Sequence, residues 1–313
     1  MKDNTKVLFK YIGGKTWLKD KIRPEIEKIL HANPDINTFK EPFAGGLGCF
    51  LNVYDILLNH NIKNIVLNDI NKKVINFYET VAKTPSVLIS EYAKIEEDYT
   101  KLVPYDNIST NKIKDKAELK VLLNEANLFY LAARKEFNQS SHDDARAAAL
   151  FLFLQTHCFN GVYRENQKGE YNTPFNWGLK RFDEVKSEES IMVVHHVFSR
   201  FEMSFTNDNY KNVDFRHNQT LYYVDPPYIN NKGEIQENKY HQDGFNDDDQ
   251  KYLIALLEDK CFIYSNHDHP LLLSEFEKTH PGCFIQRVSR KNIMSASNES
   301  RKTDKVEILV SSQ

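Results

Sequence analysis

Short apolar runs alternate with segments of helical spacing toward both ends of the chain. Apolar side chains at positions 50, 53, 54 and 57 repeat as they do on one face of a helix, and predict a helix at 49–58. A second helix is predicted at 246–260, where Asn246 can cap the N-terminus. Short segments, most of them rich in apolar residues, predict strands at 38–40, 65–67, 221–224, 261–265, 284–288 and 306–310, the first of them directly before a glycine turn. Both ends of the chain are therefore expected to contribute to one sheet with covering helices.

The middle of the chain has a different pattern. It is mainly of helical type, with helices expected at 119–137 and 144–154, and it then passes into a polar, aromatic, glycine-containing loop at 159–178. A helical insert within an α/β sheet domain is the simplest arrangement. The predicted division is a first sheet segment, a helical insert and a second sheet segment at 1–75, 76–184 and 185–313.

Composition is that of a soluble globular protein, with 41% hydrophobic and 27% charged residues. The longest apolar run, 147–154, is far shorter than the span of about 20 residues that crosses a membrane, so we expect a cytoplasmic protein without membrane association. Four scattered cysteines without a CxxC pair argue against disulfides and against a zinc site, and we predict no bound metal.

The net charge of −3 does not by itself indicate a nucleic-acid binder. Residues 286–305 nevertheless carry six basic side chains against two acidic ones. Taken alone, this stretch is more typical of a solvated basic surface loop than of a binding site.

Glycines gather at Gly13-Gly14 and within residues 45–48. The second cluster follows a predicted strand and opens a helix, and Asp69 ends the next strand. Nucleoside binding requires this spacing, because a tight turn must lie under the ligand and a carboxylate must meet the ribose hydroxyls. Leu47 and Phe50 occupy two glycine positions of the dinucleotide fingerprint, so a nucleoside cofactor without pyrophosphate fits better than NAD. A structural turn followed by an exposed aspartate is the alternative.

The strand predicted at 221–224 runs directly into Asp225-Pro226-Pro227-Tyr228. It must stop there, since proline cannot donate to the ladder and its φ is fixed. The Asp225 carboxylate and the Pro226 carbonyl are thereby expected at the C-terminal edge of the sheet, where open α/β sheets bind ligands. At average residue frequencies this tetrapeptide occurs in roughly one in a thousand such chains, which favours a functional motif over a proline-rich turn.

These residue types suit methyl transfer to an exocyclic amine. The lone pair of an aromatic amino nitrogen is delocalised into the ring, which makes the nitrogen a poor nucleophile. A carboxylate and a carbonyl can accept its two N–H bonds and favour a pyramidal nitrogen facing a methyl donor, while Tyr228 can stack on the base. Because the sulfonium of S-adenosylmethionine is strongly electrophilic, positioning and fixed electrostatics can account for catalysis without prior deprotonation.

In its order of motifs the chain resembles the Dam-type (D12 class, α-group) DNA adenine-N6 methyltransferases over nearly its whole length. The resemblance implies an α/β, Rossmann-like S-adenosylmethionine-dependent methyltransferase sheet with an inserted, mainly helical target-recognition domain. It implies that the catalytic residues, acting on an adenine flipped out of duplex DNA, are Asp225, Pro226, Pro227 and Tyr228.

Segments 9–15, 41–48, 67–71 and 205–208 resemble the cofactor motifs of this family. By resemblance, Tyr11 packs on the cofactor, Lys15 lies near its methionine end and Asp208 binds its adenine. The implied cofactor-binding residues are Tyr11, Gly13, Lys15, Pro42, Phe43, Gly45, Gly46, Asp69, Asp208 and Asp225.

Residues 134–138 resemble a helix that precedes the recognition hairpin of the family, and residues 159–175 resemble the hairpin itself. Phe159 offers an aromatic wedge for the base stack, Asn160 an amide for the orphaned base, and Arg164 a bidentate donor for a guanine edge. The implied DNA-binding residues are Lys10, Arg134, Asn138, Phe159, Asn160, Val162, Arg164 and Pro174.

Two departures from the family pattern stand out. Leu47 takes a position that is normally glycine in the cofactor loop, so we expect that loop to be shifted. Asn176-Trp177-Gly178 replaces a stretch that carries basic and aromatic side chains in members that read GATC. GATC is still the first candidate site because of Lys10 and Arg164.

Other functions stay open at this point. Transfer to cytosine N4 would use the same pair of acceptors, and protein glutamine-amide methylation uses a related tetrad, usually with asparagine in place of Asp225. A catalytically silent DNA-binding protein and a nicotinamide oxidoreductase are the remaining alternatives. We expect a monomer that acts on double-stranded DNA. A solitary enzyme, a phage product and a member of a restriction system all stay open, so a cognate restriction endonuclease is one candidate partner.

Overall fold

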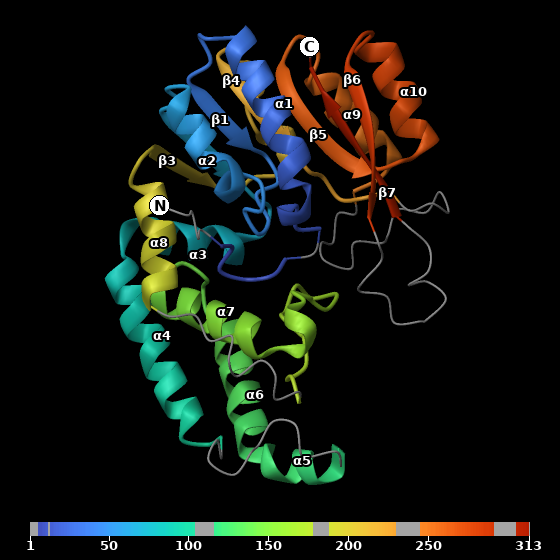
Figure 1. Ribbon diagram of the computed structural model, residues 1–313. Helices are drawn as coiled ribbons and strands as arrows, with labels where there is room; N and C mark the ends of the chain where they lie inside the picture. Colours follow the sequence, from blue (N-terminus) through green and yellow to red (C-terminus); the bar gives the residue numbers. More distant parts are fainter. Residues whose placement is uncertain are drawn as a thin grey trace. The chain divides into compact units, whose positions relative to one another are not determined.

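The computed structural model describes residues 6–11, 13–103, 116–177, 188–229, 245–290 and 305–312. The chain forms two compact units. Unit 1 comprises Met1–Gly14, Gly45–Leu51 and Asn71–Arg200, and unit 2 comprises Lys15–Ala44, Asn52–Ile70 and Phe201–Gln313. Unit 1 is mainly helical, whereas unit 2 contains the sheet (Figure 1).

Unit 2 is built on a seven-stranded sheet with the order β3-β2-β1-β4-β5-β7-β6. The first five strands in this order are parallel, and β7 runs antiparallel to both β5 and β6. The strands are β1 (Thr38–Glu41), β2 (Asn64–Asn68), β3 (Glu202–Thr206), β4 (Thr220–Val224), β5 (Cys261–His267), β6 (Phe284–Arg290) and β7 (Lys305–Ser311). The structure thus confirms the six predicted strands and a mixed α/β, mostly parallel sheet consistent with a methyltransferase fold.

The strand order reverses between β1 and β4, which lie side by side in the sheet although they are far apart in the chain. Ligands of open α/β sheets bind beyond the carboxyl ends of the strands at such a reversal. The fold therefore directs attention to the residues that follow β1 and β4.

Helices cover the sheet of unit 2. A buried cluster joins Leu253 of α9 and Phe276 of α10 to side chains of β4, β5 and β7. Asn246 caps α9 as predicted, accepting hydrogen bonds from the backbone of Asp248 and Asp249 within a capping box. The helices of this unit are α1 (Lys19–Ala32), α9 (Asp247–Leu256), α10 (Pro270–Thr279) and most of α2 (Phe50–Asn59).

In unit 1, α7 is buried at every residue from 147 to 157 and contacts α3, α4 and α6. This accounts for the longest apolar run of the sequence, because a helix that is hydrophobic all round must be enclosed by its neighbours. The helices are α3 (Lys72–Lys83), α4 (Pro85–Thr100), α5 (Lys116–Leu122), α6 (Asn124–Gln139), α7 (Ala145–His157) and α8 (Glu188–Phe198).

The prediction of a single, unbroken helix at 119–137 was wrong. Two helices, α5 and α6, meet at Leu123, whose φ of −100° and ψ of 13° lie outside helical geometry. The Leu123 side chain is fully buried, so an apolar residue that fits the helical pattern occupies the break itself. Over the described residues, no helix combines the length and apolar character needed to cross a membrane.

Candidate active site

Asp225 directly follows β4, a strand in which all five residues are buried. Both oxygens of its carboxylate lie 2.7 Å from the Lys15 ammonium nitrogen, and the Ser265 hydroxyl donates to Oδ1 at 3.0 Å. Only 2% of the Lys15 side chain is exposed. Burial raises the pKa of Asp225, while Lys15 and Ser265 act in the opposite direction by stabilising the carboxylate.

Tyr228 lies beside the same ion pair. Its hydroxyl donates to Glu307 Oε2 at 3.1 Å, its ring packs edge-on against His267, and the Lys15 ammonium lies 4.4 Å from its ring centroid. Burial and the nearby carboxylates raise the pKa of Tyr228 well above its ordinary value. The phenol therefore stays a hydrogen-bond donor at neutral pH, and Glu307 fixes the orientation of the ring.

A buried polar network holds the loop that carries the two prolines. Gln250 of α9 donates to the Pro227 carbonyl at 2.8 Å and accepts from the Tyr264 hydroxyl at 2.6 Å. Asn266 donates to the same hydroxyl and accepts from the backbone of Ile229. The side chains that hold these loop atoms come from a helix and a strand. The loop is therefore positioned without a ligand.

The side chain of Asn68, at the end of β2, joins three predicted cofactor segments. Its amide nitrogen donates to the Pro42 carbonyl at 2.9 Å and to the Asp208 carbonyl at 3.0 Å, and its oxygen accepts from the Asp208 backbone. Asp69, the next residue, is nearly buried, whereas Asp208 is exposed. Two carboxylates thus follow neighbouring parallel strands at one sheet edge, as a nucleoside ligand with hydroxyl and amino groups requires.

Aromatic rings line the residues after β1. Phe43 packs against Tyr210 and Phe245 with centroid distances of 5.6 and 6.0 Å, on the cluster that includes β4. Unit 2 therefore contains two groups of predicted cofactor residues. Lys15 lies beside Asp225, and Asn68 joins Pro42 to Asp208 next to Asp69.

The remaining predicted cofactor residues lie in unit 1. Gly45 and Gly46 pack on the Tyr11 side chain so closely that a Cβ at Gly46 would lie 2.9 Å from Tyr11 Cβ. Gly45 and Gly13 have φ values of +48° and +83°, and Leu47 also lies in the left-handed region with φ 54°. A bulky residue pays a steric penalty there, so Leu47 keeps a turn that suits glycine at some cost in strain.

Residues 158–176 of unit 1, here called the hairpin, form two antiparallel arms joined by a turn. Alternate residues face opposite sides: Tyr163, Glu165 and Tyr171 are buried, whereas Arg164 and Pro174 are exposed. Five predicted DNA-binding residues are exposed or partly exposed, on this outer side or at the start of the hairpin: Phe159, Asn160, Val162, Arg164 and Pro174. Lys10 is exposed as well.

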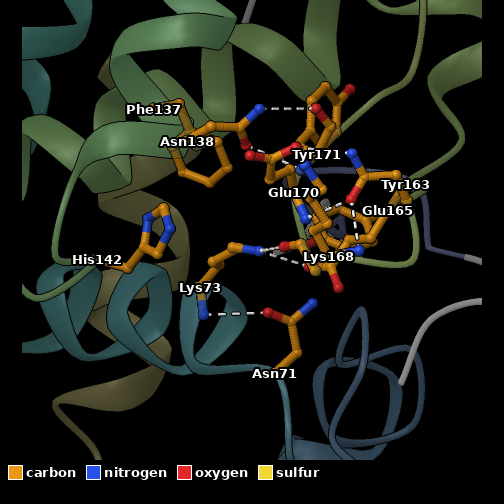
Figure 2. A network of polar contacts seen from close by, with 12 residues as sticks. Asn71, Lys73, Phe137, Asn138, His142, Tyr163, Glu165, Lys168, Glu170 and Tyr171 are labelled. Carbon is orange, nitrogen blue, oxygen red and sulfur yellow. Dashed lines mark hydrogen bonds and ion pairs between the residues drawn. The ribbon is translucent and has the colours of Figure 1, made fainter. Parts of the chain in front are cut away.

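Arg134 and Asn138 of α6 lie on the inner side of the hairpin. The Asn138 side chain exchanges two hydrogen bonds with the backbone of Tyr171, at 2.8 and 2.9 Å, and Arg134 donates to the Thr173 carbonyl at 3.3 Å. Both residues therefore hold the hairpin in this structure, and Figure 2 shows the contact of Asn138 with Tyr171.

Sequence reasoning assigned no role to several residues of these networks, among them Asn68, Ser265 and Glu307, although Asn68 lies within the predicted cofactor segment 67–71. Glu307 had a usable signature, since it is the one charged residue within the apolar run 306–310. Most of the basic stretch at 286–305 lies outside the described residues, but Arg287 pairs with Asp268 at 2.7 Å. In the described part of the chain, no group of three metal-ligating side chains is placed to hold an ion.

Comparisons with known proteins find related sequences over most of the chain. The family model described as D12 class N6 adenine-specific DNA methyltransferase matches residues 11–281. The chain is 26% identical over 310 residues to the type II methyltransferase M.MjaIII of Methanocaldococcus jannaschii, covering 97% of this chain and 98% of that protein. It is 27% identical to the DNA adenine methylases of Serratia marcescens and Escherichia coli K12, over 95% and 98% of this chain and 96% and 95% of theirs.

Proposed function

The chain belongs to the D12 class of N6 adenine-specific DNA methyltransferases, and from that premise we propose that it transfers the methyl group of S-adenosylmethionine to an adenine in a short duplex site. GATC is the first candidate for that site. The adenine would leave the base stack before it reacts, because its amino group cannot otherwise reach a carboxylate at a sheet edge.

The partly buried Asp225 carboxylate at the reversal of strand order carries the proposal. Together with the Pro226 carbonyl, it would accept the two N–H bonds of adenine N6 and direct the nitrogen lone pair toward the methyl donor. Lys15 and Ser265 support this role because they stabilise the charged, accepting form of the carboxylate against burial. Tyr228, oriented by Glu307, would stack on the base.

When bound, S-adenosylmethionine supplies an electrophilic methyl group on a sulfonium. Asp69 and Asp208 would accept hydrogen bonds from its ribose hydroxyls and adenine amino group, and Phe43 would pack on its adenine ring. As the methyl group passes from sulfur to N6, Asp225 would accept the excess N6 proton and pass it to water. S-adenosylhomocysteine and N6-methyladenine are the products.

We assign DNA reading to the hairpin of unit 1 within an inserted recognition domain at 76–184. Its outer side presents an exposed aromatic ring at Phe159, an amide at Asn160 and a guanidinium at Arg164. Asn160 has φ 58°, a conformation that asparagine tolerates better than most residues, so the turn that displays it is compatible with its sequence.

The test is methylation of unmethylated plasmid DNA by the purified protein with S-adenosylmethionine. We expect N6-methyladenine, identified by mass spectrometry of the nucleosides and mapped by sequencing to one short motif. N4-methylcytosine would instead favour the cytosine alternative. Asp225→Ala is the matched control: full activity in this variant would overturn the mechanism, and an inactive wild type that binds DNA specifically would favour a silent DNA-binding protein.

A further inference from the structure

An ion pair on the inner side of the hairpin connects it to α3. The Lys73 ammonium lies 2.6 Å from Glu165 Oε1 in the first arm and donates to the Gly169 carbonyl in the turn at 2.6 Å. Only 10% of the Lys73 side chain and 5% of the Glu165 side chain are exposed. One ammonium group therefore holds both an arm and the turn (Figure 2).

The Glu165 carboxylate is also bound from within the hairpin. The Tyr163 hydroxyl donates to the same Oε1 atom. A buried carboxylate needs a compensating charge, so Lys73 cannot leave Glu165 without a large cost. The ion pair therefore favours a single placement of the hairpin against α3, the one in which Glu165 reaches Lys73.

The turn and the second arm are fixed independently. Asn166 Oδ1 accepts from the backbone of Lys168 and Glu170, which shapes the turn, and Asn138 holds Tyr171 by two backbone hydrogen bonds. Lys73 thus acts on a compact, preformed element, and it adds the contacts that join the first arm and the turn to α3.

The placement of the hairpin against α3 determines the side on which Arg164 lies. Arg164 lies between Tyr163 and Glu165, and because successive residues of an extended arm face opposite sides, burial of these two neighbours directs Arg164 outward. There the Arg164 guanidinium donates two hydrogen bonds to Asn172. Nε donates to the side-chain oxygen at 2.7 Å, and Nη2 donates to the backbone carbonyl at 3.2 Å. A one-residue slip would turn Arg164 inward and Glu165 toward the DNA.

We propose that Lys73 is a positioning residue for DNA-site discrimination: through Glu165 and Gly169 it fixes the register in which Arg164 faces the bases. The inference rests on the proposed function. It adds that a lysine on a helix outside the hairpin sets sequence specificity while touching neither DNA nor cofactor.

The experiment compares Lys73→Met, Glu165→Gln and the double variant with Lys72→Met, a matched control on the same helix whose side chain is 52% exposed. For each protein, kcat/KM is measured on duplexes with the mapped site and with every single-base substitution of it. Affinity for S-adenosylhomocysteine and the thermal midpoint are measured in parallel, and hydrogen exchange is followed at the amides of 163–172.

Lys73→Met is expected to reduce the ratio of cognate to near-cognate kcat/KM by about tenfold, the scale of one lost base contact, with cofactor affinity unchanged. The double variant should recover thermal stability, because no buried charge is left uncompensated. It should not recover discrimination, since the tie to Gly169 is still missing. This separation distinguishes positioning from a contribution to stability alone.

Unchanged discrimination in both Lys73 variants, or an equal loss in Lys72→Met, would overturn the inference. A wild-type protein that makes no N6-methyladenine would refute the proposed function separately. The role of Lys73 is then decided by hydrogen exchange: faster exchange at 163–172 in Lys73→Met but not in Lys72→Met supports it, and equal exchange refutes it.

Discussion

Lys15 and Asp225, which are 210 residues apart in the chain, form a partly buried ion pair with the ammonium nitrogen 2.7 Å from both carboxylate oxygens. The carboxylate assigned to accept the adenine amino group is therefore paired with a lysine from the start of the chain, which favours its charged form against burial. Burial alone would raise the pKa of Asp225. The Lys15 ammonium opposes that rise, so it extends the pH range in which the carboxylate is charged to lower pH.

Replacing Lys15 with Met should raise the pKa of Asp225 further, because burial then acts without its cation. The charged form, needed to accept N–H bonds, is lost as pH falls through that pKa, so the acid limb of the kcat profile should move to higher pH. At pH 6 we expect roughly a tenfold loss, the scale of one charge-assisted hydrogen bond, with a smaller loss at pH 9. Kinetics at saturating S-adenosylmethionine would check this. A uniform loss at every pH would contradict it.

Tyr228→Phe separates the ring from its hydroxyl. The ring and its proposed stacking remain, but the hydrogen bond to Glu307 at 3.1 Å is lost, so ring orientation loosens. Single-turnover rates should fall several-fold, consistent with about 1 kcal/mol, whereas Tyr228→Ala should cost far more. Equal rates for the two variants would indicate that stacking does not contribute.

Asn68→Ala should weaken cofactor binding, because the backbone groups of Pro42 and Asp208 lose their common partner. We expect the Kd for S-adenosylhomocysteine to rise about tenfold or more. This matches the roughly 1–3 kcal/mol lost when a buried hydrogen-bonding group is left without its partner. Isothermal titration calorimetry measures it. The exposed Asn218, changed in the same way, serves as the control and should have no such effect.

Gly46→Ala places a Cβ 2.9 Å from Tyr11 Cβ, which forces the tyrosine or the loop to move. We therefore expect reduced affinity for S-adenosylhomocysteine at a nearly unchanged thermal midpoint. Gly14→Ala gives a comparison, since its Cβ would meet the Tyr11 carbonyl at 3.4 Å and the effect should be smaller. The reverse order of the two effects would argue against a role for this packing.

His142 should make stability depend on pH. Burial, with Lys73 and Lys72 nearby, lowers the pKa of His142 to about 4 from its ordinary 6.5, against smaller opposing effects of Asp143 and Asp144. The unfolded chain binds the proton more tightly between these values, so stability is lost as pH falls from 6.5 toward 4. His142→Asn, which suits the φ of 57°, should flatten that part of a thermal-midpoint profile. An unchanged slope would exclude His142 as its source.

Much of the sheet follows from local pattern. Apolar runs located β2, β4 and β5, because burial of a parallel sheet on both faces leaves continuous apolar segments. β3 escaped because only two of its five residues, Met203 and Phe205, are apolar, so it forms no apolar run.

The contacts around the site could not be predicted in the same way. Lys15 with Asp225, and Glu307 with Tyr228, join residues whose pairing is set by strand order rather than by spacing. The motif indicated which side chains matter but not which atoms hold them. Asn138 shows the same limit, since its position in the chain does not reveal that it binds the backbone of Tyr171.

The place of β7 between β5 and β6 has a consequence for synthesis of the protein. Every other strand of the sheet precedes residues 305–311 in the chain, so a growing polypeptide exposes an unpaired edge along β5 until those residues leave the ribosome. Tyr228 has no Glu307 to bind before that moment. Among the strands that the structure describes, the last to emerge thus completes both the sheet and the contact that orients Tyr228, and a nascent chain without it cannot hold this arrangement.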